Sequence, residues 1–355
     1  MQLGLCVVGC GAFARTFAQA MQAARDEIAL YFASRDVARA RAYAETFGGH
    51  GAFGSYAATA ADPRVEALYL CTPHHLHREH VTMAAQAGKH ILVEKPIART
   101  LAEARAMLAV AQEAGVTLMV AENYRFMAAV RQCKALIDGG AVGMLRMVQL
   151  QEEAPFRPAA WRNCRALNGG GVFIDSGIHK VDLLLYLAGR PEHLYAVALP
   201  PGLPGLEAED GVVVTTRSAQ GVVGLITHAW TNARHPPAPW VAVSGTLGRI
   251  YFELGAPRLT LDDGCTERVW QFVEDGDGLV PMVREFRDSI REARAPEVSG
   301  AVGLEALGVV LTVYESMEKG TSVMLPPSWS GGPPRPGWTR HAPRRDGRRG
   351  GGRGR

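Results

Sequence analysis

Short hydrophobic runs alternate with helical patterns along the first third of the chain. The apolar runs occupy positions 3–8, 28–33, 65–71, 90–93 and 117–120. Between them lie stretches with apolar residues at helical spacing, among them 37–47, 79–87 and 101–114, the last two of which stop at Gly88 and Gly115. Strands separated by helices of this length predict an α/β fold with a parallel, doubly wound sheet.

The pattern changes after Gly143. A long strand is expected at 144–152, and seven more strand-like runs separated by turns follow at 194–198, 211–216, 222–230, 240–244, 249–254, 258–261 and 268–273. Helical patterns at 279–293 and 304–318 are expected to return and cover one face of these strands. Closely spaced strands joined by turns predict a second α/β domain with a mostly antiparallel sheet.

The last thirty residues have a different composition from the rest. In 326–355, twenty-two of thirty residues are Pro, Gly or Arg, and eight Arg against one Asp give this segment a charge of +7. The whole chain carries +3, which leaves −4 for the first 325 residues. We therefore expect a first domain with the parallel sheet at 1–122, a second α/β domain at 123–325 and a disordered tail at 326–355. The tail is either an inert extension or a segment that binds nucleic acid or another acidic surface by charge, and we assign it no function.

The cysteines and the N-terminus favour a cytoplasmic location. The six cysteines show no metal-type pairing, and several lie inside apolar runs, which is typical of buried thiols in a reducing compartment. The chain enters its first strand without a basic region and an apolar leader, and we expect no membrane-spanning segment.

The first strand ends in Gly9-Cys10-Gly11-Ala12-Phe13-Ala14, a Gly-x-Gly-x-x-Ala motif that opens a helix. Gly9 allows a tight turn, Gly11 allows the backbone to approach a pyrophosphate, and Ala14 allows close packing of helix on strand. The N-terminus of the helix then faces the phosphate charge. This motif predicts a dinucleotide-binding site.

The tip of the second strand indicates which dinucleotide binds. Ser34 and Arg35 stand at the tip, and Arg39 follows one helical turn later. A small hydroxyl followed by arginine suits the 2′-phosphate of NADP, so we favour NADP over NAD. Asp36 leaves two alternatives open, because it is either an acid for the ribose of NAD or the N-cap of the next helix.

Four histidines follow the strand at 65–71, namely His74, His75, His77 and His80. No carboxylate or cysteine pattern accompanies them, so we predict no metal site. We expect His77 instead to line the cofactor cleft.

Two further stretches carry chemical groups. Glu94-Lys95-Pro96 follows the apolar run at 90–93, which places Lys95 at the carboxyl end of a strand, where α/β sheets bind ligands. Asp175 and His179 are four apart in a helical pattern and share one face, so that the carboxylate can orient the imidazole for use as a general base. The alternatives are a surface lysine and an ordinary helical ion pair.

Together these stretches resemble the glucose–fructose oxidoreductase, inositol dehydrogenase and rhizopine catabolism family, written Gfo/Idh/MocA. The matching pieces are the glycine motif at Gly9, Cys71-Thr72-Pro73-His74-His75-Leu76-His77, Glu94-Lys95-Pro96, and the segment from Gly169 to Asp182 with Asp175 and His179. They occur in the family's order over roughly residues 1–325. The resemblance implies a Rossmann domain followed by an α/β domain with a large open-faced sheet, which commonly forms the interface of homodimers or homotetramers.

The resemblance also implies roles for residues. Lys95 is expected to contact the substrate hydroxyl and the nicotinamide, His179 to accept the proton, and Asp175 to be the acid beside it. Tyr124, Arg125, Trp161 and Arg162 are expected to line the substrate pocket, although Trp161 is also compatible with plain packing and Arg125 with a structural ion pair. The expected cofactor-binding residues are Gly9, Gly11, Ala12, Phe13, Ala14, Ser34, Arg35, Arg39, Cys71, Thr72, Pro73, His77, Glu94, Lys95 and Asn123.

The activity implied is hydride transfer between NADP or NAD and a carbinol or carbonyl of a sugar, an inositol or a related polyol. His179 would take the hydroxyl proton while Lys95 stabilises the negative charge that develops on oxygen. Two alternatives are a glycosidase that uses nicotinamide for transient oxidation and a regulator that binds the cofactor without catalysis. The regulator should have lost the lysine or the histidine, and both are present here.

Overall fold

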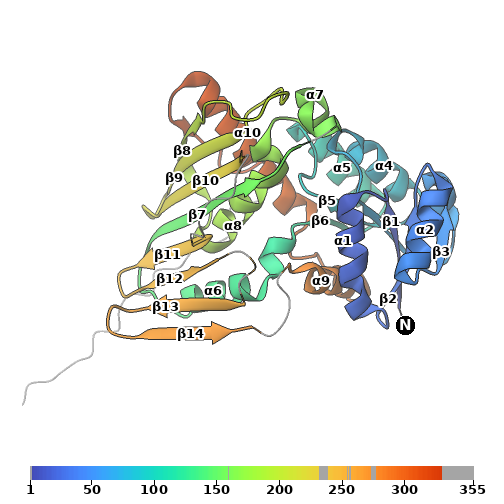
Figure 1. Cartoon of the computed structure of the whole chain (residues 1–355), viewed down its shortest axis with the longest axis horizontal. Helices are drawn as coiled ribbons and strands as arrows, with labels where there is room; N and C mark the ends of the chain where they lie inside the picture. Colours follow the sequence, from blue (N-terminus) through green and yellow to red (C-terminus); the bar gives the residue numbers. More distant parts are fainter. Residues whose placement is uncertain are drawn as a thin grey trace, which may run out of the picture.

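The computed structural model describes residues 2–158, 160–231, 239–253, 255, 257–272 and 277–329. It contains two sheets that lie side by side, with helices between and around them (Figure 1). The predicted α/β fold class is confirmed, with a parallel first sheet and a mostly antiparallel second sheet.

The first sheet is parallel and has the strand order β3-β2-β1-β4-β5-β6. Its strands are β1 (Leu3–Val8), β2 (Ile28–Ala33), β3 (Gly51–Phe53), β4 (Ala67–Leu70), β5 (His90–Glu94) and β6 (Leu118–Ala121). Every residue of β1, β2 and β4 is buried, as expected for strands covered on both faces. β1 and β4 are neighbours although a long crossover separates them, so the order reverses between them and a crevice opens at their carboxyl ends. The short β3 has no apolar run, which is why the hydrophobic pattern missed it.

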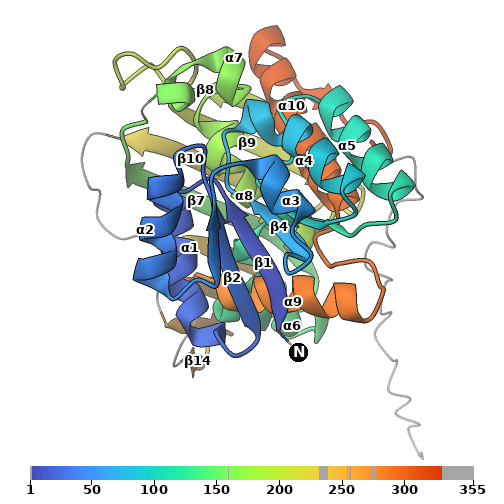
Figure 2. The ribbon, with the colours of Figure 1, turned by 90° about the vertical axis from the view of Figure 1, so that its right-hand side faces the viewer.

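Helices cover both faces of this sheet. The helices α1 (Ala12–Ala20) and α2 (Val37–Phe47) lie on one side of it, and α4 (His77–Gln86) and α5 (Leu101–Glu113) lie on the other (Figure 2). A short helix, α3 (Tyr56–Ala61), packs against β3 and α4.

The second sheet has the order β14-β13-β12-β11-β7-β10-β9-β8-β15. Its strands are β7 (Leu145–Pro155), β8 (Pro191–Ala198), β9 (Gly211–Ser218), β10 (Val223–Thr231), β11 (Val241–Gly245), β12 (Arg249–Phe252), β13 (Arg258–Asp262), β14 (Glu267–Gln271) and β15 (Val323–Met324). Within this second sheet, only the pairing of β7 with β10 is parallel among the described strands. The predicted ends of two strands, Leu254 and Val273, lie outside the described residues.

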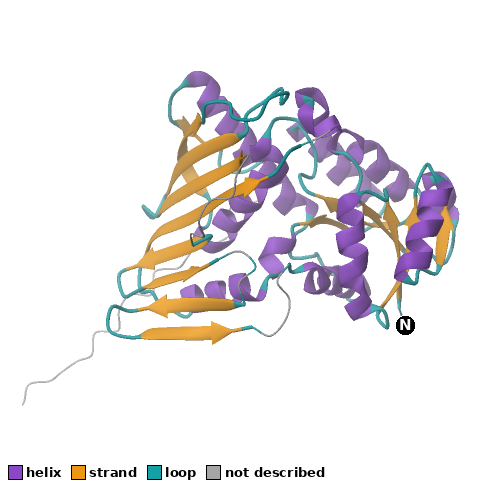
Figure 3. Ribbon diagram, viewed as in Figure 1, coloured by secondary structure: helices purple, strands orange, loops and turns teal. Residues whose placement is uncertain are grey.

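Helices cover one face of the second sheet (Figure 3). The helix α8 (Ile178–Ala188) packs on β7 and β10, and α10 (Gly300–Lys319) packs on β8, while α6 (Ala128–Asp138) contacts β13. Along β8, Tyr195 and Val197 point away from these helices and are exposed. The remaining short helix, α7 (Arg165–Asn168), lies at the junction of the two sheets (Figure 1).

The last two helices both contact the first domain, and α9 differs from the prediction that both cover the second sheet, whereas α10 does pack on that sheet. The helix α9 (Leu279–Arg291) packs on α1 and the 3₁₀ turn after it, and Arg284 and Arg287 pair there with Glu27. The helix α10 contacts α5 and β6 as well as α8 and β8. It is long and apolar enough to cross a membrane, but 61% of its most apolar window is buried inside the fold. Its composition therefore follows from packing between the two sheets.

The start of the predicted tail is also packed. Trp329 lies against Gly308 of α10, its backbone N–H donates to Glu305 at 2.8 Å, and Arg190 stacks over its ring at 4.6 Å. The predicted boundary at residue 326 is therefore too early, and the rest of the tail, 330–355, lies outside the described residues.

Candidate active site

The turn between β1 and α1 allows a ligand to approach the backbone closely. Gly9 has a φ of 100°, and a Cβ there would lie 2.7 Å from the carbonyl oxygen of Cys71, so only glycine fits. A Cβ placed on Gly11 would meet nothing within 4 Å. Gly11 caps α1, and no described side chain bonds to its first N–H groups. A helix N-terminus that faces open space fits the pyrophosphate of a dinucleotide.

The neighbouring motif residues complete this turn. Ala14 is buried and lets α1 pack on the sheet, whereas Phe13 is 40% exposed. Ala12 lines a hollow of about 420 Å³ beside the turn, together with Cys10, Gly11, Arg15, Arg39, Ala42, Tyr43 and Thr46. The Tyr43 hydroxyl donates to the carbonyl oxygen of Gly11 at 3.0 Å and so fixes the turn to α2.

Three polar residues, Ser34, Arg35 and Asp36, follow β2 at its carboxyl end. Asp36 is the N-cap of α2, where its carboxylate accepts from the N–H of Ala38 at 3.0 Å and of Arg39 at 3.4 Å. The backbone N–H of Asp36 donates to the Ser34 hydroxyl at 3.2 Å. The capping alternative for Asp36 is therefore the one that the structure contains, while Arg35 is exposed.

The loop after β4 lies beside the turn at Gly9. The role predicted for His77, which follows this loop, is wrong. His77 is fully buried, and its ring bonds to the carbonyl oxygens of Thr72 at 2.9 Å and Pro96 at 3.0 Å. Burial lowers the pKa of His77 to about 4, although the carbonyl oxygens that face its two ring nitrogens oppose this shift. His77 therefore does not line the cofactor cleft and instead ties together the loops that follow β4 and β5.

Lys95 joins the two domains. Its Nζ donates to the backbone oxygen of Asp175 at 2.7 Å and lies 3.7 Å from the Asp175 carboxylate. The other carboxylate oxygen accepts from Arg162 Nε at 2.9 Å. Arg162 also stacks over Trp161 at 4.4 Å. Lys95, Asp175 and Arg162 thus form one polar cluster where the carboxyl end of β5 meets the second domain.

The carboxylate on His179 is Glu122, whereas the sequence pattern favours Asp175. The Nδ1 atom of His179 pairs with Oε1 of Glu122, which follows β6, and both side chains are buried. Asp175 lies in a π-helical turn, Phe173–Gly177, that precedes α8. A π turn closes over five residues, so Asp175 does not sit one ordinary turn before His179.

Burial raises the pKa of Glu122 to about 7, although Lys95, Arg125 and Lys180 oppose this rise. Burial also lowers the pKa of His179, and the ammonium groups of Lys95 and Lys180 lower it further. Both effects favour a neutral imidazole, which is the form that accepts a proton.

Tyr124 covers the imidazole. Its ring stacks on His179 with centroids 3.9 Å apart and an angle of 18°, and its other neighbour is Trp240 at 5.1 Å. Beside this stack lies Lys180, which is fully buried, lies over both aromatic rings and pairs with Glu152. These contacts were not predicted, because they join strands and helices that are far apart in the sequence.

Three residues that were expected to contact substrate or cofactor contact other residues of the chain in this structure. Arg125 and Asp182 form a buried two-armed ion pair with both distances 2.6 Å, so Arg125 does not line a pocket. Trp161 packs edge-on against His74 at 4.5 Å. The Asn123 amide donates to the backbone oxygen of Asp277 at 2.5 Å.

Glu94 is engaged by the hydroxyl of the buried Tyr69, and burial raises the pKa of this carboxyl to about 7. In the described part of the chain, no three His, Cys, Asp or Glu side chains converge to hold a metal ion.

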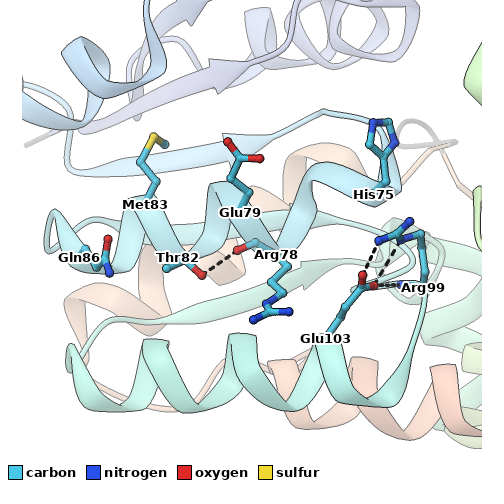
Figure 4. A pocket seen from close by; sticks show the side chains of 8 residues that line it. All are labelled: His75, Arg78, Glu79, Thr82, Met83, Gln86, Arg99 and Glu103. Atoms are coloured by element: carbon cyan, nitrogen blue, oxygen red, sulfur yellow. Dashed lines mark hydrogen bonds and ion pairs between the residues drawn. The ribbon is translucent and has the colours of Figure 1, made fainter. Parts of the chain in front are cut away.

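A second hollow, of about 500 Å³, lies between α4 and α5 (Figure 4). Its lining residues are His75, Arg78, Glu79, Thr82, Met83, Gln86, Arg99 and Glu103. Arg99 pairs with Glu103 and donates to the backbone oxygen of Ala166 at 2.7 Å. None of the residues predicted for catalysis or cofactor binding lines this hollow, so it is separate from the candidate active site.

Comparison with known proteins gives consistent matches. Residues 3–122 match the family model described as "Oxidoreductase family, NAD-binding Rossmann fold", and residues 130–251 match "GFO/IDH/MocA C-terminal domain". The chain is 33% identical to 1,5-anhydro-D-fructose reductase of Ensifer adhaerens, over 82% of this chain and 89% of that protein. It is 29% identical to D-xylose 1-dehydrogenase (NADP(+)) 2 of Haloferax volcanii, over 86% of this chain and 94% of that protein.

The fold is also found in solved structures. The structure of levoglucosan dehydrogenase in complex with NADH and levoglucosan superposes with a TM-score of 0.84 at 24% identity, covering 92% of this chain and all of that chain.

Proposed function

Because the chain belongs to the GFO/IDH/MocA family of oxidoreductases, we propose that it transfers a hydride between a nicotinamide cofactor, preferably NADP, and a carbinol or carbonyl carbon of a sugar, an inositol or a related polyol. The observation that carries this proposal is the meeting of Lys95 with Asp175, in the turn that leads into His179. A positive charge and a neutral base are thereby held near one another, at the carboxyl end of the dinucleotide-binding sheet.

In the oxidation of an alcohol, we assign the following roles to residues of this chain. A bound nicotinamide accepts the hydride when an alcohol is oxidised and supplies it when a carbonyl is reduced. The Nε2 atom of His179 takes the hydroxyl proton, because Nδ1 is engaged by Glu122. The ammonium of Lys95 stabilises the negative charge that develops on the substrate oxygen. In the opposite direction His179 returns the proton.

The preference for NADP rests on the tip of β2. Ser34 offers a small hydroxyl, Arg35 is exposed, and Arg39 lines the hollow beside Gly11 together with a second arginine, Arg15. The carboxylate of Asp36 is used as a helix cap and is less available to a ribose hydroxyl. Names of relatives support both cofactors, since the Haloferax volcanii protein is named for NADP(+) and the levoglucosan dehydrogenase structure holds NADH.

The substrate class rests on the polar groups near Lys95 and on the relatives. Lys95, Asp175 and Arg162 supply charged hydrogen-bonding groups in one cluster, and Trp161 and Tyr124 supply aromatic faces. Polyols present many hydroxyls and suit such a site. Among the relatives, 1,5-anhydro-D-fructose reductase and levoglucosan dehydrogenase are named for anhydrosugars, and D-xylose 1-dehydrogenase is named for an aldose.

We also propose that the open face of the second sheet forms a homodimer or homotetramer interface. Tyr195, Val197 and Val223 are each about 40% exposed on this sheet, and Met324 is 70% exposed. Apolar side chains at these positions are typical of a surface that pairs with a second copy. Light scattering tests this, and a monomer in Tyr195→Asp but not in Arg105→Asp, an exposed position on α5 of the first domain, would support the sheet face as the interface.

A cytoplasmic location is proposed from the thiols. All six cysteines are free in the described residues, and Cys6, Cys10 and Cys133 are buried.

Cofactor absorbance against a panel of aldoses, inositols and anhydrosugars, with NAD and NADP in parallel, tests the activity. Turnover of any carbinol supports an oxidoreductase and narrows its substrate. Cleavage of a glycoside without net change in the cofactor would contradict the proposal in favour of a glycosidase.

A further inference from the structure

The closest partner of His179 is a carboxylate from the other domain. Glu122 follows β6 in the first domain and His179 is the second residue of α8 in the second, 57 positions away, yet Nδ1 and Oε1 are paired. Glu122 is 2% exposed and His179 is 6% exposed, so water competes little for this contact.

Above its raised pKa of about 7, Glu122 is an ionised carboxylate, which can only accept a hydrogen bond, so the nitrogen that faces it carries the proton. We propose that Glu122 is the positioning residue of the active site, which fixes the Nδ1–H tautomer of His179 and leaves Nε2 free to exchange a proton with the substrate. This inference rests on the proposed function and adds to it the group that orients the base.

The segment that carries Glu122 holds α8 at two points. Glu122 binds His179, and Arg125, three residues on, binds Asp182, which is three residues after His179. Between them, Tyr124 stacks on the imidazole ring at 3.9 Å. The ring is therefore fixed at its edge by Glu122 and on one face by Tyr124, while its helix is locked by the Arg125–Asp182 pair. Such an arrangement restricts the imidazole to one orientation.

The charges around the Glu122–His179 pair explain why a carboxylate is needed beside the imidazole. The titratable groups that face it come from six segments, namely Lys95 after β5, Tyr124 and Arg125 in the turn after β6, Glu152 on β7, Asp175 in the π turn, Lys180 on α8 and His228 on β10. Lys95 and Lys180 disfavour a positive charge on the imidazole.

When Nε2 takes the substrate proton, the substrate O–H bond breaks, an N–H bond forms and the ring becomes cationic. The carboxylate of Glu122 lies directly on that ring and offsets the new charge. Because the two groups interact strongly, they titrate as a unit with shared apparent pKa values.

The test is Glu122→Gln, which keeps the shape and removes the charge. We expect kcat for oxidation to fall about 100-fold or more, with KM for the cofactor within about two-fold of wild type, because only the proton transfer is weakened. The alkaline side of the pH–activity profile should lie at a different pH in Glu122→Gln than in the wild type. Glu122→Asp should recover part of kcat, since the carboxylate is restored at a slightly greater distance.

Glu297→Gln is the matched control, because it removes a carboxylate from a partly exposed pair with Arg131 outside the site, and it should retain wild-type kcat and pH profile. A Glu122→Gln enzyme with wild-type kcat and pH profile would overturn the proposal.

A readout without turnover keeps this test separate from that of the proposed function. Protein labelled with ¹⁵N-histidine, with the signals of residue 179 assigned through His179→Asn, reports which ring nitrogen carries the proton. We expect Nδ1–H in wild type and a changed tautomer or mixture in Glu122→Gln. Nε2–H in the wild type would overturn the proposal, whereas absence of turnover in a protein with the Nδ1–H tautomer would count against the proposed function alone.

Discussion

The ammonium group of Lys95 reaches from the first domain to the second, where it meets the backbone oxygen and the carboxylate of Asp175. Replacing it with Met keeps the length of the side chain and removes the charge. We expect Lys95→Met to lower kcat by at least about 100-fold, because the developing charge on the substrate oxygen loses its stabilising cation.

Cofactor binding should change little in Lys95→Met, because the turn at Gly9 and Gly11 is untouched, and a fluorescence titration measures it. Lys89→Met is the control, since Lys89 donates to the backbone oxygens of Asp62 and Val65 at the opposite end of β5. Full turnover in Lys95→Met would remove this residue from the mechanism.

Ser34 is the uncharged residue that directly follows β2. Ser34→Asp places a carboxylate where a 2′-phosphate is expected, so the ratio of kcat/KM for NADP to that for NAD should fall at least about ten-fold, equivalent to about 1.4 kcal/mol. Steady-state kinetics with both cofactors measures the ratio. Ser34→Ala controls for loss of the hydroxyl and should change the ratio less. An unchanged ratio in Ser34→Asp would mean that the 2′ position is recognised elsewhere.

At the level of whole elements, the ion pair between Lys180 and Glu152 fixes α8 on β7. Burial by itself would raise the pKa of Glu152, but the charge and hydrogen bond of Lys180, together with His228 and His179, outweigh it and lower the pKa to about 2. In an unfolded chain the pKa of a glutamate is about 4.3. The pair therefore stabilises the fold fully above about pH 5, and this contribution is lost as the pH falls from there toward 2.

Glu152→Gln removes the charge and leaves Lys180 buried without its partner, which we expect to cost about 3–5 kcal/mol at neutral pH. The difference in free energy of unfolding between wild type and Glu152→Gln should shrink as the pH is lowered from 5 to 3, and urea titrations at several pH values measure it. A difference that stays constant over this range would contradict the assignment.

Sequence patterns predict a local structure well where the residues that shape it are adjacent in the chain. The glycine turn after β1 and the cap at Asp36 are such cases, because the residues that shape them are adjacent. They fail where a partner comes from a distant segment. His77 was expected in the cleft but bonds to the loop after β5, and the four-residue spacing of Asp175 and His179 was misleading because a π turn intervenes.

Glu122 illustrates the same limit. In the sequence it is one polar residue after an apolar strand, and nothing near it points to His179. Only the docking of the two sheets brings the pair together. A carboxylate at the carboxyl end of a parallel strand was the one available signal, since ligands bind at that edge.

For the whole molecule, the first domain is completed by residues from the far end of the chain. On α9, Met282, Val283 and Phe286 are buried, and the helix packs on α1 and the turn after it. Each large apolar side chain buried in this way contributes roughly 1.5–3 kcal/mol. Ion pairs from Arg284 and Arg287 to Glu27, and from Arg291 to Glu66, surround the contact.

A fragment of residues 1–122 should therefore not fold into a stable cofactor-binding domain, although it contains every strand of the first sheet. It would expose the apolar faces of α1, α5 and β6 that α9 and α10 cover. We expect a broad, weakly cooperative thermal transition by circular dichroism and no measurable cofactor binding. Joining residues 279–325 to the fragment through a flexible linker should restore a sharp transition, because it restores the missing contacts. The control is the same fusion with Met282→Asp and Phe286→Asp, which should behave like the fragment alone. A fragment 1–122 with a sharp transition and normal cofactor affinity would show that the first domain is stable without its C-terminal helices.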